Sequence, residues 1–252
     1  MSLIVFALIG VALGLALGLF GGGGGILAIP LLVAAGVPAD EAGTTALVVV
    51  GIGALGGLIP HARAGRVDWA EGLTFAAMGT AGAVGGSVLA LRTDDTIQLA
   101  AFAVLLVVAG VLMLRRAISE TDSAASAPPR DRAAWPLVVG TALVVGLMTG
   151  FFGVGGGFLI VPALVLVLGM EIHRATATAL LVIAVNSAAA FVPRATEVLD
   201  VPAAITVTIG VLIAAAAAAR WSTSWSQRSL GVGFAVLVLA MSALTMAQAA
   251  AG

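Results

Sequence analysis

Long apolar segments separated by short polar stretches make up most of this chain. The first runs from Leu3 to Ala35, and the first charged side chain after Met1 is Asp40. The following segments are Thr44 to Ile59, Trp69 to Leu91, Thr96 to Leu114, Trp135 to Leu168, Ala175 to Val192, Val201 to Ala219 and Leu230 to Ala249. Apart from the two that glycines interrupt, each is near the length of about 20 residues that a membrane span needs. The pattern predicts an all-α integral membrane protein.

The two interrupted segments contain the same glycine-rich stretch. Residues 18–30 read GLFGGGGGILAIP and residues 150–162 read GFFGVGGGFLIVP, so glycines, a phenylalanine, a leucine and the final proline fall in register. Each glycine costs a helix about 1 kcal/mol relative to alanine, so we expect a break in each copy. We predict that the helices restart near Gly24 and Gly156. Pro30 and Pro162 would then lie early in the restarted helices, where a missing N–H is tolerated.

The two halves match beyond the glycines, after a shift of one residue. Gly36 then aligns with Gly169, residues 45–47 (TAL) align with residues 178–180 (TAL), and Pro60 aligns with Pro193. We predict two copies of one unit, residues 1–115 and residues 134–252, joined by a polar linker over residues 116–133.

The arginines discriminate between two topologies. If each broken segment crosses the membrane once, the halves are parallel and the arginines divide 7 to 4 between the two sides. If each is a hairpin, the halves are inverted and only Arg92 and Arg194 oppose the other nine. Short cytoplasmic loops collect arginine, which favours the hairpin. We therefore predict two inverted repeats, each a glycine-broken hairpin plus three transmembrane helices, with a cytoplasmic linker and extracytoplasmic termini.

Composition excludes several classes of function. Hydrophobic residues make up 61% of the chain and charged residues 9%, against about 25% charged in soluble domains. There is no cysteine and there are two histidines, so Cys/His metal sites are absent and no cofactor is expected. No basic patch points to nucleic acid, and no nucleophile–base pair points to an enzyme. His61 and His173 lie at span ends, where we expect solvated loop residues.

The glycine breaks are the candidate binding site. A restarted helix presents free backbone N–H groups and its positive dipole end, which bind anions without a buried cation. Inverted-repeat transporters place their sites at such broken helices. The competing interpretation is close helix packing, which fits Gly10, Gly14, Gly79, Gly82, Gly85 and Gly86. The predicted substrate-binding glycines are Gly21, Gly22, Gly23, Gly24, Gly25, Gly153, Gly155, Gly156 and Gly157.

Polar side chains within the spans are the second set of candidates. Thr44 and Thr176 are predicted to cap helices, whereas Thr45 and Thr178 align between the halves and either cap a helix or line a polar path. Asn186 and Ser187 lie inside a span. They either contact substrate or form a hydrogen bond between helices. We include Thr45, Thr178, Asn186 and Ser187 in the predicted substrate shell.

At residues 18–30, residues 150–162 and the paired Thr-Ala-Leu sequences, the chain resembles the sulfite exporter TauE/SafE family, also called the toluenesulfonate uptake permeases. The resemblance covers nearly the whole chain. It implies a bacterial-type inner-membrane transporter of sulfonates, sulfite or related sulfur oxyanions, built from two repeated halves. Val154 replaces the glycine found at Gly22, so the halves need not contribute equally.

We therefore expect a secondary transporter of small anions that works by alternating access. A passive anion channel on the same fold, and a non-transporting assembly factor for a membrane enzyme, remain as alternatives. The expected partners are a small anionic substrate and the lipid bilayer; substrate identity, direction and oligomeric state do not follow from the motif.

Overall fold

The computed structural model describes residues 3–37, 39–90, 93, 95–119, 135–152, 157–191 and 201–251. These ranges are helical apart from short turns, and no strand occurs within them. The first half contains α1 (Leu3–Phe20), α2 (Gly23–Ala34), α3 (Ala39–Arg63), α4 (Trp69–Ala90) and α5 (Asp95–Ser119). The second half contains α6 (Trp135–Phe152), α7 (Gly157–Pro162), the π-helical η2 (Ala163–Val167), α8 (Ile172–Phe191), α9 (Val201–Trp221), the 3₁₀ turn η4 (Ser222–Ser224) and α10 (Gln227–Ala251).

Four of these helices contain stretches long and apolar enough to cross a bilayer. In the described part of the chain they are Leu3–Phe20, Thr44–Arg63, Ile172–Ala189 and Ala204–Trp221. Large apolar side chains lie on the outside of the bundle, among them Ile4 and Ile213, 70% and 66% exposed. An apolar exterior of this kind matches hydrocarbon rather than water. The prediction of an all-α integral membrane protein is confirmed.

The first glycine stretch folds the chain back on itself. A Cβ placed on Gly24 of α2 would lie 2.9 Å from the Leu13 carbonyl of α1 and would also contact the Leu17 side chain. Gly21, with φ +70°, makes the reversal in the left-handed region that glycine tolerates. The helix restarts at Gly23, one residue from the predicted Gly24. The α1–α2 segment is thus a hairpin, with α2 running back along α1.

Glycine stripes join the two halves at two helix pairs. On α1, a Cβ at Gly10 would lie 3.2 Å from the Val207 Cα of α9, and one at Gly14 would lie 2.7 Å from the Ala214 Cβ. Residue numbers rise together along both helices, so α1 and α9 are parallel. Gly82 and Gly86 on α4 contact α6 in the same way, through Leu143 and Leu147. The packing interpretation of the scattered glycines therefore holds, except at Gly85, where a Cβ would meet nothing.

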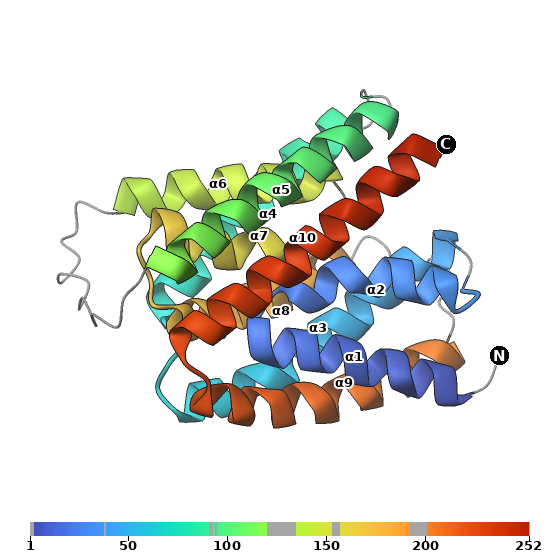
Figure 1. Ribbon diagram of the computed structural model, residues 1–252, viewed down its shortest axis with the longest axis horizontal. Coiled ribbons are helices and arrows are strands. Elements are labelled where there is room, and N and C mark those ends of the chain that lie inside the picture. Colours follow the sequence, from blue (N-terminus) through green and yellow to red (C-terminus); the bar gives the residue numbers. More distant parts are fainter. Residues whose placement is uncertain are drawn as a thin grey trace.

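All arginines in the described ranges lie at one end of the bundle. Arg174 at the start of α8 lies 3.4 Å from Asp68, next to Arg66 in the α3–α4 turn. Arg63 and Arg220 line one pocket at the ends of α3 and α9. The N and C ends of the chain lie at the opposite end (Figure 1). The group consists of Arg63, Arg66, Arg115, Arg116, Arg174, Arg220 and Arg228.

Three predictions that involve prolines are wrong. The predicted segment ends at Ile59, before Pro60, but Pro60 lies inside α3, which continues to Arg63. Pro30 is the eighth residue of α2 rather than part of its first turn, so the helix loses the bond to the carbonyl four residues earlier. Pro162 is the last residue of α7, and η2 follows it directly.

The π-helical turn explains the one-residue shift between the halves. Five residues separate Pro30 from Gly36, and six separate Pro162 from Gly169. At the end of α2 the Val37 N–H donates to the Leu32 carbonyl, whereas the equivalent Met170 N–H donates to Leu164, one residue further back. A π-turn holds one residue more than an α-turn, so η2 absorbs the inserted residue. Gly36 and Gly169 then end both elements with positive φ, +82° and +64°.

Candidate functional site

The two glycine stretches meet in the interior of the bundle. A Cβ on Gly22 would clash with the carbonyl group of Gly157, and one on Gly157 would lie 3.3 Å from the Gly22 Cα. Both residues are buried. The hairpin of the first half and the restarted helix of the second half therefore touch through backbone atoms, with no side chain between them. Gly153, Gly155 and Gly156, also predicted for the site, lie outside the described residues.

The first turn of α2 begins at this junction and has no side-chain cap. Gly22 precedes the helix and supplies no side-chain hydrogen bond to it. The leading N–H groups of α2 thus lack a side-chain cap and carry the positive end of the helix dipole. Gly23 and Gly24 pack tightly against Leu237 and Leu17, whereas a Cβ on the buried Gly25 would meet no described atom within 4 Å. Among the described residues, the first turn of α2 is therefore unfilled on the Gly25 side.

Thr176 of α8 places a hydroxyl beside the same junction. It is 2% exposed, and a Cβ on Gly21 would lie 2.8 Å from its Cα. The Thr176 Oγ1 makes no hydrogen bond with any described residue. The predicted capping role is wrong for both Thr44 and Thr176, because α3 begins at Ala39 and α8 at Ile172, at least four residues earlier. A buried hydroxyl without a partner costs free energy unless a ligand or water satisfies it.

His61 and Arg66 add two further unsatisfied groups on the arginine-rich side of the junction. His61 is 1% exposed, and neither ring nitrogen makes a well-formed hydrogen bond, although the Gly18 carbonyl approaches the ring. The Nη1 atom of Arg66 is likewise buried without a partner, and its charge acts on His61 and His173. The expectation of a solvated loop histidine is wrong for His61, because α3 continues past Pro60 and carries the ring into the bundle.

The structure separates Thr45 from Thr178. Gly51 of α3 lies against Ser187 of α8, and Gly57 lies against Leu180, so the two helices are antiparallel. Thr45 and Thr178 then lie on opposite sides of this crossing, roughly 20 Å apart along the helices at 1.5 Å per residue. Both are fully buried.

Their hydroxyl groups also differ in their partners. The Thr178 Oγ1 accepts a hydrogen bond from the Asp68 N–H at 3.1 Å and so fixes the α3–α4 turn. The Thr45 Oγ1 has no partner among the described residues. The two threonines therefore do not form one symmetric pair around a single ligand.

Asn186 and Ser187 lie in the C-terminal half of α8 and contact other helices. The Thr80 hydroxyl of α4 donates to the Asn186 Oδ1 at 2.9 Å. Ser187 is 5% exposed, and a Cβ on Gly51 would lie 2.9 Å from its Cβ. The structure thus provides the interhelical hydrogen bond that was the competing interpretation for Asn186.

The fold and the junction define the class of this protein. It is a multi-pass α-helical membrane protein in which two interrupted elements meet inside the bundle. In the described part of the chain, the Thr176 hydroxyl, the His61 ring and the Arg66 Nη1 atom are buried without hydrogen-bond partners. Interrupted backbone at membrane depth survives only where protein or a polar cavity surrounds it.

Comparison with known proteins places the chain in a family. Residues 6–245 match the model of the family described as sulfite exporter TauE/SafE, and the chain belongs to this family. A "Probable membrane transporter protein" of Xylella fastidiosa is 40% identical over 190 residues, which cover 72% of this chain and 70% of that protein. The "Probable membrane transporter protein YunE" of Bacillus subtilis is 27% identical over 208 residues, 74% and 76% of the two chains. Family and relatives point to a membrane transporter of the TauE/SafE type rather than to an enzyme.

Proposed function

We propose that this chain is a secondary transporter that moves a small anion of the sulfonate or sulfite class across a bacterial inner membrane. The observation that carries the proposal is the contact between Gly22 and Gly157, beside the uncapped start of α2. Backbone N–H groups are the donors that bind oxyanions at helix N-termini. The family description supplies the sulfur oxyanion class.

The anion would lie in the space beside Gly25, within reach of the first N–H groups of α2. The buried Thr176 hydroxyl is a further donor near that turn, because Thr176 contacts Gly21. His61 and Arg66 lie on the arginine-rich side and would receive the anion from that end. A sulfonate presents three oxygen acceptors, so a set of several donors without a buried carboxylate suits it.

Alternating access would follow from movement of one half against the other around this junction. The α1–α2 hairpin supports the inverted relation between the halves, as does the position of Arg174 and Arg220 beside Arg66 and Arg63. In the parallel topology Arg174 and Arg220 would lie on the opposite side of the membrane from Arg66 and Arg63. The arginine-rich end is then cytoplasmic and both termini are extracytoplasmic.

The test is transport by purified protein in liposomes. Sulfite and a short alkanesulfonate should enter with saturation and should be accelerated by the same anion on the opposite side. Flux that stays linear with concentration and shows no acceleration would identify a passive channel instead. Binding without any flux, in protein that co-purifies with a membrane enzyme, would identify an assembly factor.

A further inference from the structure

The pocket between α3 and α9 includes no residue of the glycine junction. Its volume is about 600 Å³, far above the roughly 30 Å³ that one water molecule occupies in the liquid. It lies between two helices that are long and apolar enough to span the membrane. Ile59 and Ile213 line it and are 52% and 66% exposed, so the pocket faces the surroundings of the bundle.

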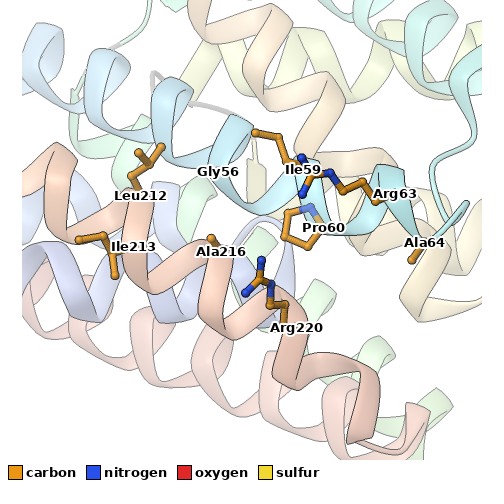
Figure 2. A pocket seen from close by; sticks show the side chains of 9 residues that line it. All are labelled: Gly56, Ile59, Pro60, Arg63, Ala64, Leu212, Ile213, Ala216 and Arg220. Atoms are coloured by element: carbon orange, nitrogen blue, oxygen red, sulfur yellow. The ribbon is translucent and has the colours of Figure 1, made fainter.

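The lining has two chemically different parts. Arg63 and Arg220 occupy the end of the pocket near the ends of α3 and α9. Every other lining residue is apolar or glycine, with Ile59, Leu212 and Ile213 providing the larger side chains. Figure 2 shows the two guanidinium groups on either side of Pro60, while Leu212 and Ile213 extend away from them along α9. The two arginines therefore place positive charge at one end of an otherwise apolar groove.

The depth of the pocket matches the boundary between hydrocarbon and headgroups. Trp221 follows Arg220 directly and is 64% exposed, as expected of an interfacial anchor. Long arginine side chains at this level keep their charge among the headgroups while their stems lie along apolar surface. The groove continues from there toward the middle of the two spans.

We propose that this pocket binds an anionic phospholipid. The phosphate would lie between Arg63 and Arg220, and an acyl chain would lie along Ile59, Leu212 and Ile213. The two arginines favour an anionic headgroup, since basic pockets between transmembrane helices hold anionic headgroups. The apolar part of the groove favours a lipid over a free anion, because only a lipid has an acyl chain that can contact Ile59, Leu212 and Ile213. Because α3 belongs to the first half and α9 to the second, the lipid would bridge the two.

The test compares lipid binding by wild type with binding by R63Q/R220Q. Delipidated protein in detergent is titrated with phosphatidylglycerol or phosphatidylcholine, and bound lipid is counted by native mass spectrometry. We expect wild type to prefer phosphatidylglycerol, and the variant to bind it about 30-fold more weakly, given the usual contribution of each basic side chain near a membrane surface. The matched control is R115Q/R228Q, which removes two exposed arginines at the same end of the bundle but outside the pocket.

A second pair of variants tests the apolar wall. A216F fills the groove and leaves both arginines in place, whereas A81F adds the same ring at an exposed position on α4. A216F should lose the lipid and A81F should keep it. Equal phosphatidylglycerol binding by R63Q/R220Q and R115Q/R228Q would overturn the proposal. So would stabilisation by glycerol 3-phosphate or inorganic phosphate equal to that by the lipid, or equal binding of phosphatidylcholine.

Discussion

Gly22 touches Gly157 so closely that a Cβ on Gly22 would clash with the Gly157 carbonyl oxygen. Replacing Gly22 with alanine must therefore move one backbone against the other. We expect G22A to lower the free energy of unfolding by about 1–3 kcal/mol, the usual cost of overpacking a buried site. Thermal unfolding in detergent measures it. G140A is the control, because a Cβ at Gly140 meets nothing within 4 Å; equal stability of the two variants would contradict the contact.

Gly25 offers a variant that separates folding from transport. It is buried, yet the space beside it is open. G25V should unfold within about 1 kcal/mol of the matched G140V, because a Cβ at either helical position has no described atom within 4 Å. Anion flux in liposomes should fall by at least about tenfold for G25V alone, equivalent to 1.4 kcal/mol of lost binding. Full flux through stable G25V would exclude the space beside Gly25 as the anion site.

Two buried threonines should respond to valine in opposite ways. Thr176 has no hydrogen-bond partner among the described residues, whereas the Thr178 hydroxyl accepts a bond from the Asp68 N–H at 3.1 Å. T176V should keep or raise thermal stability, because no bond is lost, and should lower sulfite or sulfonate flux. T178V should lose about 1 kcal/mol of stability, because the partly buried Asp68 N–H loses its hydrogen bond. A destabilised T176V with unchanged flux would assign Thr176 a structural role.

The bond between Thr80 and Asn186 can be measured with a double-mutant cycle. T80V, N186L and the double variant are compared by thermal or denaturant unfolding in detergent. Interhelical hydrogen bonds in membrane proteins couple their partners by about 0.6 kcal/mol on average and seldom by more than 1.7 kcal/mol. We expect a coupling energy in this range and little effect on flux. If N186L lowers anion flux and T80V does not, Asn186 contacts the substrate as well as Thr80.

The absence of cysteine makes the topology directly testable by labelling. Ala34 at the end of α2 and Ser226 before α10 are both exposed and lie at opposite ends of the bundle. In intact cells, A34C should react with a membrane-impermeant maleimide, whereas S226C should react only after permeabilisation. The cysteine-free parent is the background control. The reverse labelling pattern would reject the proposed orientation.

The fold was predictable from hydropathy because each uninterrupted apolar segment corresponds to one helix, and the two glycine-interrupted segments contain the remaining helices. The predicted end of α3 at Ile59 was wrong, since a proline near the last turn of a helix does not have to end it, and α3 continues through Pro60 to Arg63. The one-residue shift between the repeats was visible in the sequence, but its cause was not. The hydrogen bond from Met170 to Leu164 locates the inserted residue in a helical turn rather than in a loop.

The candidate site was predictable only in part. The glycine run at residues 21–25 marked the junction, because no packing motif needs so many consecutive glycines. Hydropathy gave no signal for His61, since a histidine at the end of an apolar segment has the same pattern whether it is buried or solvated. Thr178 and Thr45 align between the repeats, but alignment cannot reveal that only Thr178 bonds a loop.

The π-helical turn at η2 also means that the two matching halves differ in backbone conformation where the chain leaves the glycine stretch. In the first half α2 returns from the junction as an α-helix, while the second half returns through six α-helical residues and then a π-helical turn. A π-turn is rare and occurs mostly as a single turn within an α-helix, frequently at a functional site. The same substitution made at matching positions of the two returning segments should therefore not have the same effect.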